Sequence, residues 1–186
     1  MVKKTETTQI LTTPKLQAQV QPSLGRCLKH FFYLPLAQRM FKKADQLAIA
    51  EAVKAAERGH IGEIQVVIEG HIPASLAYRM DCLLRARHLF AELGVWDTQY
   101  NSGVLLYLNL CEQRVEIVID RGLQQLTTQA RWDSICADLI QGLKNKAYRA
   151  AVCQAIAAIG EVFQEFDAQT PPDQGNEISD LPVILN

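Results

Sequence analysis

Two short polar segments stand at the outer ends of the most apolar hairpin that the sequence predicts. Carboxylate and amide oxygens gathered from several loops suit a hard cation such as calcium or magnesium. An arginine beside a bound cation could in turn hold a phosphate ester. The candidate metal ligands are Asp97, Asn101 and Asp120, and the candidate contacts to a phosphate or a partner are Ser102, Arg121 and Gly122.

The predicted hairpin gives the reason why these residues should meet. Strand-forming runs cover residues 104–108 and 114–119. In an antiparallel pair, the segment before the first strand lies beside the segment after the second. A further strand is expected at residues 63–69, and a helical crossover would make it parallel to the first strand of the hairpin. His60 and Glu63 would then join the same end of the sheet.

A purely structural interpretation of the two segments stays open. Asp97 and Asn101 belong to residue types that commonly cap loops, and Asp120 with Arg121 could form a salt bridge at a turn. Ser102 has no histidine and aspartate partners that the sequence reveals, which disfavours a nucleophile. The four histidines show no metal-ligand spacing, and no P-loop, dinucleotide-binding glycine motif or GxSxG elbow is present.

The elements around the hairpin alternate between helical and strand periodicity, which indicates an α/β domain. In the strand at residues 63–69, Ile64, Val66 and Ile68 face a core, so the opposite face is expected to be wet. The residues expected to face water are Glu63, Gln65 and Glu69. Helices are expected at residues 44–58, 73–93, 132–143 and 148–166.

The predicted domain covers residues 44–167. Residues 1–25 are rich in Thr, Gln and Lys, and we expect disorder there because they cannot bury enough apolar surface to offset the entropy of ordering. Residues 26–43 form a basic, aromatic segment without an acid, and residues 168–186 form an acidic tail.

Each of the two flanking segments has two interpretations. The basic segment either packs on its own domain, because its aromatic side chains need cover, or touches an anionic membrane surface. The LPVIL sequence near the end of the tail either folds back on its own domain or adds as a strand to an exposed sheet edge.

Composition limits the class of protein. The 186 residues carry a net charge of −1 and five dispersed cysteines, which argues against a nucleic-acid binder and for a reduced, cytoplasmic protein. No signal peptide and no apolar run long enough for a membrane-spanning helix is evident. We expect a monomer, with a position peripheral to the inner membrane as the alternative to a free cytoplasmic one.

The hairpin sequence NSGVLLYLNLCEQRVEIVIDRGL resembles the core signature of the TPM domain, in which N-x-G-V-L and a hydrophobic run precede a short turn and an R-x-V-E-I strand. Other segments are similar to a bacterial, soluble branch of that family, and the resemblance extends over about residues 26–186. These segments are HIGEIQVVIE, LFAELGVWDT, IDRGL and NEISDLPVIL.

The resemblance implies an α/β sandwich, with a mixed central sheet and helices on both faces. It also implies links to divalent-cation binding, to weak acid phosphatase activity and to the assembly or maintenance of membrane complexes. The residues that fall in loops where family members carry acidic residues are Asp97, Asn101, Asp120, Arg121 and Gly122. The chain departs from the family in lacking a membrane anchor and in having Asp-Arg-Gly where much of the family has Gly-x-Gly.

Two functions follow as hypotheses. The first is a non-enzymatic accessory module that recognises a protein partner or a membrane complex, with a calcium or magnesium site at one end of the sheet. The second is a weak metal-dependent acid phosphatase in which Asp97 and Asp120 hold the metal and Arg121 holds the phosphate. Nucleic-acid binding has only the short basic segment in its favour.

Overall fold

A four-stranded mixed sheet forms the centre of the computed structural model, which describes residues 20–33, 37–124, 127–167 and 175–185. The strand order is β3-β2-β1-β4. β1 pairs parallel with β2 and β4, and β2 pairs antiparallel with β3. The strands are β1 (Glu63–Glu69), β2 (Gly103–Asn109), β3 (Arg114–Ile119) and β4 (Val183–Leu185).

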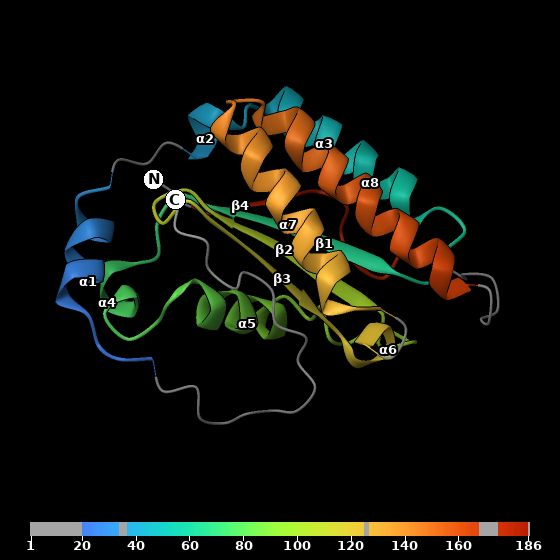
Figure 1. The fold of residues 1–186 in the computed structure, drawn as a ribbon, viewed down its shortest axis with the longest axis horizontal. Coiled ribbons are helices and arrows are strands. Elements are labelled where there is room, and N and C mark those ends of the chain that lie inside the picture. The colour runs from blue at the N-terminus through green and yellow to red at the C-terminus, as the bar shows by residue number, and fades with distance from the viewer. Residues whose placement is uncertain (1–19, 34–36, 125–126, 168–174, 186) are drawn as a thin grey trace.

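Helices cover both faces of this sheet, as Figure 1 shows, so the expected α/β sandwich is confirmed. One face packs against α3 (Lys43–Glu57), α7 (Gln129–Lys144) and α8 (Tyr148–Asp167). The other face packs mainly against α5 (Cys82–Glu92). β2 is apolar on both faces and buried throughout because it is a central strand, as its sequence indicates.

The helix expected at residues 73–93 is two helices, and this part of the sequence prediction was wrong. α4 (Ala74–Ala77) ends early, and α5 begins after Asp81, whose side chain accepts a hydrogen bond from the Leu84 N–H at 2.8 Å. A capping aspartate starts a new helix because it satisfies a free backbone donor. The predicted end at Gly94 is correct, with φ of 69°.

The wet face predicted for β1 is also wrong, because Glu63, Gln65 and Glu69 are only 3%, 4% and 1% exposed. Glu69 accepts hydrogen bonds from the Arg85 guanidinium of α5 at 2.8 Å and from the Tyr107 hydroxyl at 2.6 Å. Such partners make burial of a carboxylate possible. Periodicity distinguishes polar from apolar faces and does not reveal that a polar face is covered.

The basic segment lies against its own domain through α1 (Leu24–Phe31), while α2 is a single turn (Ala37–Met40). Arg26 Nε donates to the Ala77 carbonyl at 2.6 Å, and Lys29 Nζ pairs with Glu112 at 3.0 Å. α1 begins two residues inside the stretch that we expected to be disordered, of which residues 1–19 lie outside the described residues.

The described part of the tail belongs to the sheet. β4 pairs with β1 from Val67↔Val183 to Glu69↔Leu185. The LPVIL sequence therefore folds back as an edge strand of its own domain, and the domain extends beyond residue 167. Among the helices that the structure describes, none is long and apolar enough to cross a membrane.

Candidate functional site

The two predicted polar segments do meet at one end of the sheet. The Asp120 N–H donates to the Gly103 carbonyl at 2.9 Å, and the Gly122 N–H donates to the Asn101 carbonyl at 2.8 Å. β1 and β2 start in register at Glu63↔Gly103. We call this end of the sheet the rim, and it consists of residues 97–102, residues 120–122 and the start of β1.

Glycines allow the rim loops to pack closely. A Cβ on Gly103 would overlap the Val95 carbonyl oxygen, and a Cβ on Gly122 would lie 2.5 Å from the Tyr100 carbonyl oxygen. Both neighbours are backbone atoms, which cannot rotate away as a side chain can. Gly122 lies in the short helix α6 (Arg121–Gln124), which stands where the sequence predicted a loop. The two glycines are therefore needed for the close approach of the loop before β2 to Val95 and to the start of α6.

Ser102 lies inside the rim and is fully buried. Its N–H donates to Thr98 Oγ1 at 2.9 Å, and its hydroxyl donates to the Ile61 carbonyl. The side chain thus holds the loop to the segment before β1 and faces the protein in this conformation.

Asp120 has one carboxylate oxygen without a partner. Oδ1 accepts a hydrogen bond from the Arg121 N–H at 2.6 Å, whereas Oδ2 is buried and has no hydrogen-bond partner in the structure. Burial raises the pKa of Asp120, although the Arg121 N–H and charge act in the opposite direction. An orphaned buried oxygen of this kind is unusual in folded proteins.

The Arg121 side chain reaches the loop that precedes β2. Its Nη2 lies 3.3 Å from Asn101 Oδ1, and the side chain is exposed. Asn101 has a left-handed backbone with φ of 53°, a conformation in which asparagine is enriched. If these residues have only a structural role, that role is a hydrogen bond between Arg121 and Asn101.

Asp97 lies further out in the same loop. It is exposed, and its N–H donates to the Gly94 carbonyl at 2.9 Å. The structure thus brings Asn101, Asp120, Arg121 and Gly122 into one contact network. Asp97 has no hydrogen bond to this network among the contacts that the structure describes. Whether these residues bind a cation stays a prediction.

Sequence reasoning missed a contribution from the C-terminal segment. The carboxylate of Glu63 accepts hydrogen bonds from the N–H groups of Glu177 and Ile178 at 3.2 and 3.1 Å. The Glu177 carboxylate in turn accepts a hydrogen bond from the Gln99 N–H at 3.0 Å. The acidic NEISD sequence was the only sign in this segment of a contact with the rim. Its pattern does not show where in the fold the segment lies.

A second missed acid, Glu57, lies at the end of α3 behind the start of β1. Its Oε1 accepts a hydrogen bond from the Ile64 N–H at 2.7 Å. Burial, with repulsion from Glu63 and Asp180, raises its pKa to about 9, while the Ile64 N–H lowers it. A carboxyl group with this pKa is largely protonated at neutral pH, so Glu57 adds a buried acid behind the rim without adding a full negative charge.

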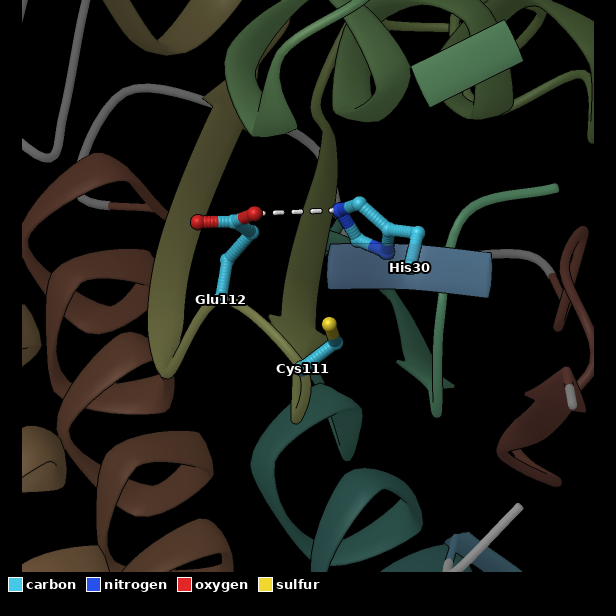
Figure 2. Close-up of side chains that lie close together, drawn as sticks. All are labelled: His30, Cys111 and Glu112. Atoms are coloured by element: carbon cyan, nitrogen blue, oxygen red, sulfur yellow. Dashed lines mark ion pairs between the residues drawn. The ribbon is translucent and has the colours of Figure 1, made fainter. Parts of the chain in front are cut away.

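The far end of the sheet contains a different cluster, His30, Cys111 and Glu112, drawn in Figure 2. Within the part of the chain that the structure describes, this is the only group of three His, Cys, Asp or Glu side chains with ligand atoms within 4.8 Å of one another. His30 Nδ1 accepts the Ile72 N–H at 3.0 Å, and Nε2 lies 3.1 Å from a Glu112 oxygen.

These contacts argue against a metal at the far-end cluster. A nitrogen that accepts an N–H carries no proton, so the neutral imidazole of His30 has its proton on Nε2, the atom that lies 3.1 Å from Glu112. Neither ring nitrogen then has a lone pair free for a metal. The cluster instead fastens α1 to the turn between β2 and β3.

The sequence matches a known protein family over most of this α/β domain. The sequence profile of the TPM domain matches residues 37–162, well over half of the chain. The chain belongs to the TPM domain family. The match includes every residue of the rim, and it ends before the C-terminal segment that contacts the rim.

A solved structure supports the fold of this TPM domain. The NMR structure of the BA42 protein from the psychrophilic bacterium Bizionia argentinensis is similar with a TM-score of 0.67. It shares 20% sequence identity, and the alignment covers 77% of this chain and 94% of that chain. No curated protein matches the sequence.

Proposed function

We propose that this TPM domain is a non-enzymatic accessory module that binds calcium or magnesium at the rim and acts on a protein partner or a membrane complex. The observation that carries the proposal is the buried Asp120 Oδ2, which lacks a hydrogen-bond partner. A cation there would neutralise a carboxylate that burial now penalises.

The other predicted ligands fit an irregular oxygen site. Asn101 Oδ1 and the exposed Asp97 carboxylate belong to the loop that faces Asp120, and calcium accepts mixed carboxylate, amide and backbone oxygens. Arg121 now contacts Asn101 Oδ1. Cation binding through that oxygen requires Arg121 to turn toward solvent, which its exposed position permits.

Calorimetric and NMR titration with calcium, magnesium and manganese tests the rim site. Asp120→Asn is the informative variant, because the amide oxygen can still accept the Arg121 N–H while the negative charge is lost. We expect saturable binding to the wild type and at least a tenfold loss of affinity in the variant. Asp138→Asn, an exposed acid on α7, is the matched control and should bind as the wild type does. Equal binding by all three proteins contradicts the proposal.

The partner part of the proposal is supported by the outer face of α1. The large apolar side chains of this face and of the residue that follows α1 are between 54% and 74% exposed, and the helix contains Lys29 and no acid. The exposed residues are Leu24, Leu28, Phe31 and Phe32. Such a face is typical of contact with another apolar surface. Co-sedimentation with phosphatidylglycerol vesicles, compared between wild type and Phe31→Ser, tests a membrane as that surface.

A weak metal-dependent acid phosphatase is the second candidate. The exposed Arg121 guanidinium beside Asn101 and Gly122 is the observation in its favour, because arginine binds phosphate oxygens well. Hydrolysis of nitrophenyl phosphate that requires the cation and disappears in Asp120→Asn and Arg121→Gln supports this activity. Cation binding without turnover supports the accessory module.

A further inference from the structure

The far end of the sheet has a cavity of about 770 Å³. It lies beyond the carboxyl end of β2, between the end of α7 and the start of α8, at the end opposite to the rim. In α/β folds with parallel strands, ligands commonly bind at the carboxyl ends of the strands. The size also suits a small organic molecule.

The wall of this cavity is mainly apolar, with two tyrosines. Tyr148 packs edge-on against Phe41 with ring centroids 6.1 Å apart, which fixes its ring. The Cys111 thiol at the edge has a pKa raised to about 11 by burial and is therefore no nucleophile at neutral pH. The principal lining side chains are Tyr33, Leu108, Leu110, Ile140, Leu143 and Tyr148.

The charges at the cavity are of one sign. Lys144 and Lys146 line it and are exposed, and its described lining residues include no carboxylate. Arg114 also borders the cavity, but strand alternation directs its side chain to the face that carries Glu116. Two lysine ammonium groups therefore set the local field.

Two turns border the cavity. Gln113 and Lys146 have left-handed φ values of 54° and 61°. Both residues line the cavity. Gln113 belongs to the turn between β2 and β3. Lys146 stands in the turn that ends α7, since its N–H donates to the Leu143 carbonyl at 3.0 Å and the next N–H donates to the Gly142 carbonyl at 3.1 Å. The left-handed backbone therefore shapes the two turns that border the cavity.

We infer that this cavity binds a small amphipathic anion, with an aromatic or aliphatic body against the apolar wall and one acidic group at Lys144 and Lys146. The apolar lining excludes a fully hydrated anion such as inorganic phosphate, because nothing would replace the water stripped from it. The lysines favour an acid over a neutral molecule of the same shape. This site is distinct from the rim and independent of the function proposed for it.

Anilinonaphthalene sulfonate is a suitable probe because it joins an aromatic body to one anionic group. Its fluorescence titration gives affinity, and amide chemical shifts in the ¹⁵N-labelled protein locate the site. Anilinonaphthalene without the sulfonate measures the apolar contribution alone. We expect shifts centred on the ends of β2 and α7, and at least fivefold weaker binding of the neutral compound. Shifts centred on α1, or equal affinity for both compounds, would overturn the inference.

The lysines are tested with the double variant Lys144→Gln and Lys146→Asn. Asparagine tolerates the left-handed backbone at position 146. We expect affinity for the sulfonate to fall about tenfold, with the neutral compound unchanged. Lys54→Gln, an exposed lysine of α3 outside the cavity, is the matched control.

A variant that fills the cavity with a larger side chain distinguishes loss of the binding site from loss of folding. Ile140→Trp should exclude both compounds from the cavity while thermal unfolding and cation binding at the rim remain as in the wild type. Unchanged sulfonate affinity in both the double variant and the filling variant would show that the probe binds elsewhere.

Discussion

Glu57 near the rim and Glu112 at the far end are both glutamates in partly or fully buried positions, yet their pKa values move in opposite directions. Burial raises the pKa of Glu57 to about 9, whereas His30 and Lys29 hold that of Glu112 at about 2. The two pKa values differ because the charged groups next to the two carboxylates differ. Glu112 contacts a lysine ammonium group at 3.0 Å, and Glu57 has neighbouring acids.

The acids at the two ends of the sheet therefore differ in whether a cationic side chain neutralises them. The far-end carboxylate is neutralised within the protein and fastens α1 in place. At the rim, Glu63 and Asp120 are both buried. Glu63 accepts the N–H groups of Glu177 and Ile178, whereas Asp120 Oδ2 has no hydrogen-bond partner. A buried carboxylate oxygen without a hydrogen-bond donor, such as Asp120 Oδ2, is the condition under which an external cation binds favourably.

The largest expected loss of stability comes from a substitution that disrupts the rim and leaves the far end intact. Gly103→Ala places a Cβ against the Val95 carbonyl, and because backbone must move, we expect a loss of about 3 kcal/mol in the free energy of unfolding. Urea denaturation measures it. Gly25→Ala is the control, since only Ser23 Oγ lies near, at 3.9 Å. A loss below about 1 kcal/mol would contradict the role given to Gly103.

Glu112→Gln removes the charge that pairs with Lys29 and His30 at the far end of the sheet. The lowered pKa means that Glu112 contributes stability above about pH 4.5 and loses it as pH falls toward 2. With the side chain 18% exposed, we expect the free energy of unfolding of the variant to be about 2 kcal/mol lower at neutral pH. We also expect its stability to depend less on pH between 4.5 and 2 than that of the wild type. Urea unfolding across the pH range measures both, and faster hydrogen exchange in α1 would localise the change. Glu92→Gln, whose partner distance is 3.9 Å, should change little.

Glu57→Gln sharpens the contrast because the sign is reversed. A raised pKa means that the contribution of Glu57 is complete below about pH 4.5 and is lost as pH rises toward 9. We therefore expect the stability of the wild type to decline over this range, and the variant to recover roughly 1–2 kcal/mol at pH 8. Its amide oxygen can keep the Ile64 N–H contact. A pH profile identical to that of the wild type would refute the assignment.

The smallest effect concerns Asp120→Asn without added metal. Removal of a buried charge that lacks a full set of partners should change stability by less than about 1 kcal/mol, in the stabilising direction. Addition of calcium should then raise the melting temperature of the wild type and leave that of the variant unchanged. Differential scanning calorimetry with and without the cation measures both results.

Much of the fold could be predicted from local patterns. The alternation in β1 and β3, the fully apolar β2 and the helical stripes of α7 and α8 correspond to elements of the structure. Asp81 was not recognised as a cap, so one predicted helix is two. The failure is local, since a capping side chain competes with the apolar periodicity that continues across it.

The candidate site could be predicted only in part. Residues near the ends of the hairpin must meet, so Asn101 and Asp120 were found by topology alone. Glu57 and Glu177 reach the rim through long-range contacts that no spacing rule encodes. The charged side of β1 was expected to face water because pattern analysis cannot see α5 or the C-terminal segment covering it.

The sequence by itself determined the class of fold, the hairpin, the TPM resemblance and the meeting of two polar loops, because these depend on residues close together in the chain. The tertiary structure decided which carboxylates are buried and which have a cation beside them. It also decided that the tail is a strand of the sheet and that a lysine-bordered cavity lies at the far end. The physical reason is that burial and electrostatic partners depend on contacts between distant segments, which local patterns do not specify.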